Sequence, residues 1–131
     1  NLKAILFSSK LESMTKNEEK IEVFPLDEIF EKKKLQYVDL IKIDTEGHEL
    51  EVLLGASKTI KKFKPNYIQI EYNWHHLIKN VNLYHFSKLL KNYEVFKILP
   101  NDEDLMKIDP LRPEHNYFNF SNIVFKKKKN K

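Results

Sequence analysis

The feature that most constrains the fold is an apolar run that ends in a carboxylate. Residues 38–44 read Val-Asp-Leu-Ile-Lys-Ile-Asp, and Leu40, Ile41 and Ile43 make the run nearly continuous in apolar character. A short run of this kind is typical of a strand that is buried on both faces of a sheet. Helical spacing follows over 47–54, which predicts a helix with its leucines inward. The chain therefore contains a strand–turn–helix unit of an α/β protein.

Strand and helix patterns alternate through the middle of the chain. This alternation favours a layered sheet with right-handed crossovers. The last two strands have no clear helix between them, so we expect them to pair antiparallel at an edge. Strands are predicted over 3–8, 21–24, 38–44, 67–72, 93–99 and 121–125, helices over 26–33, 47–54 and 83–91, a further short helix capped by Ser57 that ends before Pro65, and an exposed loop over 11–20.

Size and composition limit the class of protein. The chain has 131 residues, 41% of them hydrophobic, which suits one compact domain with one core. It has no cysteine, which excludes disulfides and thiolate metal sites and fits a reducing cytoplasm. No stretch approaches the ~20 apolar residues of a membrane helix, and no secretory signal opens the chain. We therefore expect a cytoplasmic protein with no membrane partner.

The net charge of +4 comes almost entirely from lysine, because Arg112 is the only arginine. Proteins that read nucleic acids use arginine where bidentate contacts matter, so no nucleic-acid partner is predicted. The charge run at 126–131 is predicted to be a disordered, solvated basic tail. Contact of residues 126–129 with a nucleic acid or an anionic surface is the alternative.

Polar side chains gather after two successive predicted strands. Asp44 and Glu46 share one face while the chain stays extended, and the backbone at Gly47 can approach a ligand closely because it has no Cβ. Glu71 closes the next strand and would lie beside Asp44 across one strand spacing of ~5 Å. Ligands of open α/β sheets bind beyond the carboxyl ends of the strands. This edge is therefore the candidate site for a polar substrate.

The same turn also has structural interpretations. Thr45 would cap the helix, and Glu49 is more readily explained as a surface charge that matches the helix dipole. His48 would then be exposed and inert, and Gly47 would only permit the turn. Asp44 fits a structural role least well, because a carboxylate that closes an apolar strand needs a partner or a function.

The segment after Glu71 offers a second set of polar and aromatic groups. Trp74, His75 and His76 follow in succession. An imidazole and an aromatic ring beside two carboxylates suit a site for a polar substrate. The alternative is that both histidines lie in a solvated loop and that Trp74 covers the core.

The string VDLIKIDTEGHELEVLLGA, residues 38–56, resembles the signature of FkbM-type methyltransferases. That signature is a buried strand, Lys-Ile-Asp, one residue, Glu-Gly, one residue, Glu, then Leu and Gly-Ala. Flanking segments are similar too, at Pro25-Leu26-Asp27, at Lys64-Pro65, at Ile70-Glu71 and in the closing strand over 122–125. The positions that match the signature are Lys42, Ile43, Asp44, Glu46, Gly47, Glu49, Leu53, Gly55 and Ala56.

The resemblance implies the carboxyl-terminal half of a Rossmann-like methyltransferase sheet, α/β in class and mostly parallel with an antiparallel edge. Asp44 would close its fourth strand and Glu71 its fifth. A complete domain of this type normally carries a Gly-rich loop after its first strand, whereas this chain has only Gly47 and Gly55. Residues 1–131 are therefore expected to form a single partial methyltransferase domain. The N-terminal Gly-rich cofactor-binding half would be absent, and the chain alone would be inactive.

The implied activity is transfer of a methyl group from S-adenosylmethionine to a hydroxyl, on a sugar or glycan or on a secondary metabolite. Such a transfer mainly requires alignment, and a sugar hydroxyl also benefits from a general base. No metal is expected. The expected roles are catalysis by Asp44, Glu46, His48 and His75, cofactor binding by Asp44 and Gly47, and acceptor binding by Glu71 and Trp74.

Two other functions stay open. Asp44 and Glu46 superficially resemble the acidic pair that holds a divalent ion against a sugar nucleotide, as in a metal-dependent glycosyltransferase-like enzyme. A truncated, non-catalytic module is the other. The expected partner is a small-molecule or glycan acceptor. An exposed half-sheet would also suit a second copy of the chain, as in a homo-oligomer, or a missing N-terminal segment.

Overall fold

A computed structural model of the chain describes residues 4–8, 22–100 and 104–129. Strands and helices alternate up to β3, as the sequence predicts, and the predicted loop over 11–20 lies outside the described residues. The elements are β1 (Ala4–Ser8), α1 (Leu26–Lys32), β2 (Leu40–Asp44), α2 (Glu49–Leu54), α3 (Ser57–Phe63), β3 (Tyr67–Tyr72), α4 (Trp74–Ile78), α5 (Leu83–Leu89), β4 (Tyr93–Ile98), β5 (Leu105–Lys107), the short 3₁₀ turn η1 (Pro113–His115) and β6 (Ser121–Lys127).

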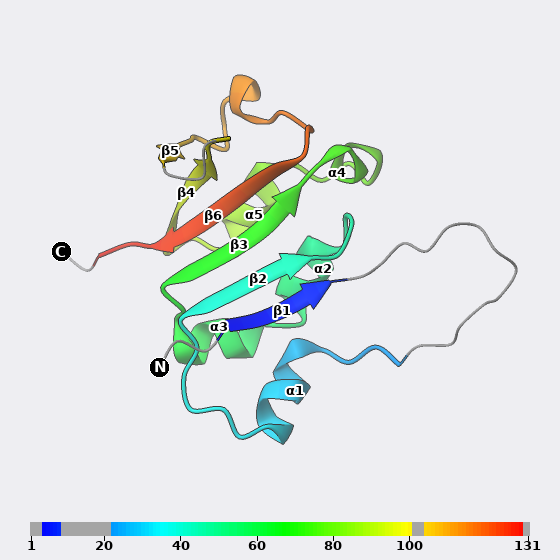
Figure 1. Cartoon of the computed structure of the whole chain (residues 1–131), viewed down its shortest axis with the longest axis vertical. Helices are drawn as coiled ribbons and strands as arrows, with labels where there is room; N and C mark the ends of the chain where they lie inside the picture. The colour runs from blue at the N-terminus through cyan, green and yellow to red at the C-terminus, as the bar shows by residue number, and fades with distance from the viewer. Residues whose placement is uncertain (1–3, 9–21, 101–103, 130–131) are drawn as a thin grey trace, which may run out of the picture.

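The described strands form one mixed sheet in the order β1-β2-β3-β6-β4-β5 (Figure 1). The pairs β1–β2 and β2–β3 are parallel, and the pairs β3–β6, β6–β4 and β4–β5 are antiparallel. The predicted α/β class is confirmed, but the prediction of a mostly parallel sheet is wrong. No described α-helix connects β4 to β6, and strands that lack a crossover helix pair antiparallel. β6 also lies inside the sheet, between β3 and β4, rather than at its edge.

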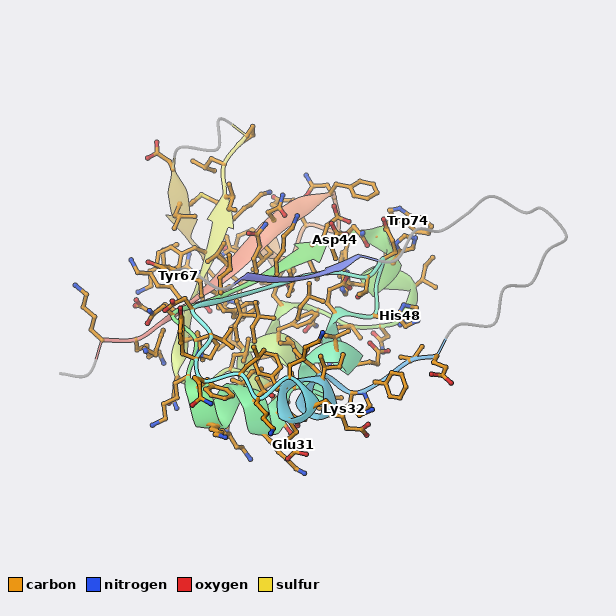
Figure 2. All side chains as sticks on the ribbon, turned by 60° about the horizontal axis from the view of Figure 1, so that its bottom comes forward. Glu31, Lys32, Asp44, His48, Tyr67 and Trp74 are labelled. Carbon is orange, nitrogen blue, oxygen red and sulfur yellow. The ribbon has the colours of Figure 1, made fainter. Side chains whose placement is uncertain are left out.

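The two faces of the sheet differ in burial. Ile41 and Ile43 of β2 and Ile68 and Ile70 of β3 are fully buried, on the face that α2, α3 and α5 cover (Figures 1 and 2). Alternate residues of β2, including Lys42, are only half-buried on the other face. The expectation that this strand is buried on both faces is therefore wrong for its polar face. The covered face supplies the core, and the other face leaves polar side chains available at the sheet edge.

Several element boundaries differ from the sequence-based predictions. Residues 22–24 form no strand, and Val23 is 82% exposed. Helix α4 occupies a segment for which we predicted no helix. β6 runs through Lys127, so its last two residues belong to the segment 126–131 that was predicted to be a disordered tail. Backbone pairing holds this end, since the Lys127 amide donates to the Asn66 carbonyl at 2.9 Å.

Helix α3 is capped from another element rather than by its own first residue. The Asp27 carboxylate of α1 accepts hydrogen bonds from the backbone amides of Lys58 and Thr59, at 3.1 and 2.7 Å. Ser57 makes no capping bond, which overturns the prediction for that residue. Burial raises the pKa of Asp27, but the hydrogen bonds from Thr59 and Lys58 outweigh this effect, so the pKa lies below its usual value. Asp27 therefore fastens α1 to α3.

We predict that Asp27→Ala lowers the free energy of unfolding by about 1 kcal/mol, because it leaves two helix N–H groups without their acceptor. Glu28→Ala, at an exposed position of the same helix, should have little effect. Because the folded-state pKa of Asp27 is lowered, its contribution is present above the unfolded-state pKa and is lost as pH falls through the folded-state pKa. Urea unfolding of the three proteins at neutral and acidic pH checks this. Equal losses in both variants would contradict it.

Candidate functional site at the carboxyl ends of β2 and β3

The turn after β2 is shaped by two consecutive residues with positive φ. Glu46 has φ +52° and Gly47 has φ +97°. A side chain at Gly47 would have no room, because an ideal Cβ there would lie 2.6 Å from the Cβ of His75. The absence of a side chain at Gly47 therefore lets the turn pack against α4. A left-handed conformation at a residue other than glycine costs about 1 kcal/mol or more, so other contacts must hold Glu46 in place.

Three carboxylates converge at this edge. Asp44 ends β2, Glu46 lies in the turn, and Glu71 is on the half-buried face of β3. One carboxylate oxygen of each lies within 4.8 Å of the others. The sequence-based prediction that Glu71 lies beside Asp44 is confirmed. Oxygens at this separation would suit a cation, whether a divalent metal ion or an organic cation.

The side-chain amide of Asn73 links two of the carboxylates. Its Nδ2 donates to Glu71 Oε2 at 3.1 Å and lies 3.5 Å from Glu46 Oε2. Burial raises the pKa of Glu71, and the negative charges of Asp44 and Glu46 raise it further, while the hydrogen bond from Asn73 works in the opposite direction. The net effect is a raised pKa, so full ionisation of the three carboxylates is disfavoured even with Lys42 Nζ 3.9 Å from Asp44 Oδ2.

The imidazole of His75 lies against the same cluster. Its Nδ1 is 3.3 Å from Glu46 Oε2, and its side chain is 22% exposed. The indole of Trp74 packs on the His75 ring with centroids 4.0 Å apart, and Trp74 itself is 46% exposed. The predicted pairing of an imidazole and an aromatic ring with the carboxylates is therefore present in the structure. The alternative that Trp74 covers the core is wrong.

His48 lies near the site but outside the carboxylate cluster. Figure 2 shows Asp44, His48 and Trp74 at one end of the sheet and Tyr67 at the other. The exposed His48 ring has its Nδ1 3.2 Å from the Thr45 carbonyl oxygen. Within the described part of the chain, no hydrogen bond or ion pair joins His48 to Asp44, Glu46 or Glu71. Of the two predicted candidate bases, the geometry favours His75.

Two further residues lie directly beneath the turns. Glu49 and His76 are both fully buried, with Glu49 Oε2 2.8 Å from His76 Nε2. Burial raises the pKa of Glu49, but hydrogen bonds from His76 and Thr45 more than compensate, so the pKa lies below its usual value. The interpretations of Glu49 as a surface charge and of His76 as a loop residue are therefore wrong. Their pairing could not be predicted from local patterns, because the two residues are far apart in the chain.

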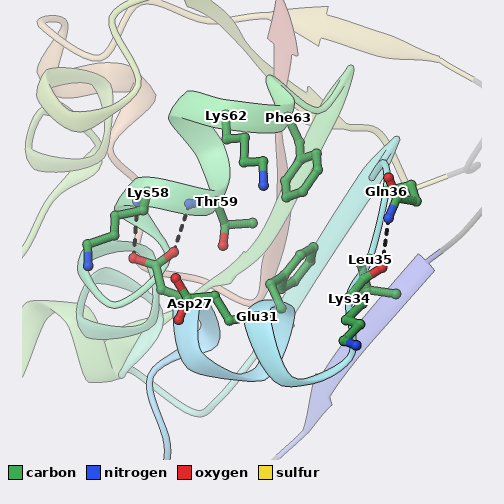
Figure 3. A pocket seen from close by; sticks show the side chains of 10 residues that line it. Asp27, Glu31, Lys34, Leu35, Gln36, Lys58, Thr59, Lys62 and Phe63 are labelled. Carbon is green, nitrogen blue, oxygen red and sulfur yellow. Dashed lines mark hydrogen bonds between the residues drawn. The ribbon is translucent and has the colours of Figure 1, made fainter.

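A separate cavity of about 330 Å³ lies between α1 and α3 (Figure 3). The rings of Phe30 and Phe63 lie in its wall, with centroids 5.7 Å apart, and Lys34, Lys58 and Lys62 surround it. None of its lining residues belongs to the carboxylate cluster. It is therefore a second concave feature, distinct from the edge where the predicted site residues meet.

Comparison with models of known protein families assigns the chain to one of them. A family model described as "Methyltransferase FkbM domain" matches residues 3–94, well over half of the chain. The chain belongs to the FkbM methyltransferase family. The family match contains all the carboxylates and histidines of this edge and ends before β6, so the resemblance of the closing strand lies outside it. No curated protein and no solved structure matches the chain.

No described helix of this FkbM family member is long and apolar enough to cross a membrane.

The two glycines of the chain form a matched pair for a test of the turn. Gly47→Ala should lower the free energy of unfolding by about 2 kcal/mol or more, because it adds a clash with His75 to an unfavourable φ. Gly55→Ala should change it little, since Gly55 has an ordinary negative φ and the nearest atom to its added Cβ would be 3.6 Å away. Urea denaturation of both variants measures the difference. Comparable effects at the two positions would contradict the described turn.

The crowding of carboxylates predicts a pH-dependent gain from Glu71→Gln. The pKa of Glu71 is raised in the folded state. The free energy of unfolding therefore falls as the pH rises from the unfolded-state pKa of Glu71 to its folded-state pKa. The neutral variant avoids this loss and should be more stable than the parent at neutral pH, by up to about 1 kcal/mol. The difference should disappear in acid. Urea unfolding across pH checks the sign, and a variant less stable at neutral pH would contradict it.

Proposed function

We propose that this FkbM domain takes part in S-adenosylmethionine-dependent methyl transfer to a hydroxyl of a sugar, glycan or secondary metabolite. The observation that carries the proposal is the meeting of Asp44, Glu46 and Glu71 with the His75 imidazole at the carboxyl ends of two parallel strands. Family membership supports the reaction class. The position supports a ligand site, because ligands of open α/β sheets bind beyond these strand ends.

The donor set suits this cofactor chemically. S-adenosylmethionine supplies a methyl group that is activated by a positively charged sulfonium. Asp44 and Glu46 would provide the negative potential that attracts a cation to this edge. A bound cation would also offset the mutual repulsion that, in addition to burial, raises the pKa of Glu71. The contribution of Gly47 is to let the turn close on His75, which brings Glu46 and the imidazole together.

His75 is the group best placed to remove the proton of an acceptor hydroxyl. A neutral imidazole with its Nδ1–H toward Glu46 keeps its lone pair on Nε2, where it can accept a proton. The carboxylate then stabilises the imidazolium that forms. Such a general base contributes about 10²–10⁴-fold to a reaction that needs one.

Glu71 and Trp74 would hold the acceptor. The Glu71 carboxylate can accept hydrogen bonds from neighbouring hydroxyls, and the half-exposed indole of Trp74 offers a flat apolar surface of the kind that packs on a sugar ring. Trp74 contacts the ring of His75. Glu71 belongs to the same carboxylate cluster as Glu46, which His75 contacts. An acceptor that touches both would present a hydroxyl near the imidazole.

The carboxylate cluster also keeps a metal-dependent glycosyltransferase as a second candidate, because its oxygens are close enough together to hold a divalent ion. The family assignment favours methyl transfer. Calorimetry separates the two. S-adenosylhomocysteine should bind to the purified chain, or to the longest polypeptide that its reading frame encodes. Manganese-dependent binding of a sugar nucleotide, with no S-adenosylhomocysteine bound by either polypeptide, would overturn the proposal.

Two aspartates at opposite ends of β2 provide a test of the site. Asp44→Asn should lower the rate of methyl transfer to a panel of sugar hydroxyl acceptors by about a hundredfold, because it removes a charge beside the reacting groups. Asp39→Asn serves as the control, since Asp39 precedes the other end of β2 and pairs with Asn66. Release of S-adenosylhomocysteine measures the rate. Near-normal turnover in Asp44→Asn would remove that residue from the mechanism.

A further inference from the structure

The turns after β2 and β3 are joined by a buried carboxylate–imidazole pair. Glu49 Oε1 accepts from the Thr45 amide at 2.7 Å and from its hydroxyl at 3.1 Å, which closes the first turn. Glu49 Oε2 faces His76 Nε2 at 2.8 Å. Among the described residues, neither of these two buried atoms makes a hydrogen bond, so their close ion-pair contact is the one polar approach that each has.

The other ring nitrogen of His76 belongs to the second turn. The Asn73 backbone amide lies 3.2 Å from His76 Nδ1 and donates to it. The same nitrogen lies 3.3 Å from the Asn73 carbonyl oxygen, so it accepts or donates within this turn according to the tautomer of the ring. The ring is enclosed by Tyr72 and Phe86, with centroids 5.0 and 5.6 Å away.

We propose that Glu49 and His76 are positioning residues for the proposed methyltransferase site, which fix the two turns that carry its polar groups relative to each other. Thr45 lies between Asp44 and Glu46, and Asn73 lies between Glu71 and His75. The pair therefore connects the backbone of one set of carboxylates to that of the other. The inference rests on the proposed function for its ligand, and on the observed contacts for its geometry.

The energetics favour a positioning role over a purely stabilising one. Isolated burial of a carboxylate is costly, and well-packed apolar residues often stabilise a fold at least as well as a buried ionic pair. A pair of this kind adds direction, because the Glu49–His76 contact and the hydrogen bonds of each residue to its own turn can form together in only one arrangement. The carboxylate cluster needs such a constraint, since its members repel one another and Glu46 has a left-handed backbone.

Conservative variants can break the Glu49–His76 contact between the two turns while keeping the hydrogen bonds that close each turn. Glu49→Gln keeps the oxygen that Thr45 uses, but places a donor against the donor of His76. His76→Asn keeps an acceptor for the Asn73 amide and loses the reach to Glu49. His76→Gln keeps an N–H near the original Nε2. We expect Glu49→Gln and His76→Asn to weaken S-adenosylhomocysteine binding about tenfold or more, and His76→Gln to restore most of the affinity.

Two controls distinguish positioning from general destabilisation. Val95→Ala removes buried volume from β4, and Glu51→Gln breaks the surface pair that joins α2 to Lys79. Both controls should bind S-adenosylhomocysteine like the parent. If Val95→Ala weakens binding as much as Glu49→Gln does, or if Glu49→Gln and His76→Asn bind normally, the positioning role is overturned.

Nuclear magnetic resonance tests the pair without any ligand. The His76 ring in the parent chain should show a proton on Nε2, the nitrogen that faces the Glu49 carboxylate. Glu49→Gln should shift amide resonances in both turns, over 44–48 and 73–76, while Glu51→Gln should not. Absence of a proton on His76 Nε2, or shifts confined to the first turn, would overturn the inference. Failure of the parent to bind S-adenosylhomocysteine, with these shifts intact, would count against the proposed function instead.

Discussion

The parallel pairing of β2 with β3 is the contact on which the site depends. Ile41 and Ile43 pair in register with Ile68 and Ile70, and all four side chains are buried against the helices. A shift of one residue would move these isoleucines to the polar face, so burial fixes the register. The same register brings Asp44 and Glu71 to one edge. Core packing and the placement of the carboxylates are therefore consequences of one pairing.

The carboxylate edge is stable only because several contacts oppose its electrostatic repulsion. Asn73 neutralises part of it through hydrogen bonds, His75 contacts Glu46, and the buried pair beneath ties the turns together. None of these contacts removes the net negative character, and burial together with the charges of Asp44 and Glu46 keeps the pKa of Glu71 raised. Lys42 also places a positive charge at this edge, with its Nζ 3.9 Å from Asp44 Oδ2.

Local sequence patterns predicted the parallel half of the fold well. The strand over 67–72 was predicted with the bounds that are observed, and the helix after Asp44 begins only two residues later than expected. The pattern also placed Asp44 and Glu71 together. It failed where a residue's partner comes from a distant segment. Glu49 resembles an exposed helix-dipole charge until His76, on another element, is seen against it, and α3 is capped by Asp27 of α1 rather than by Ser57.

The antiparallel half was predicted less well because its order depends on pairing rather than on local pattern. The insertion of β6 between β3 and β4 could not be derived from an alternating strand near the end of the chain.

Whether the cofactor binds at the carboxyl ends of β2 and β3 can be measured with the isotope-labelled protein. The measurement is which backbone amide resonances shift when S-adenosylhomocysteine is added. We expect shifts clustered over 44–49 and 71–75. Shifts confined to residues 27–36 and 58–63, around the cavity between α1 and α3, would contradict it.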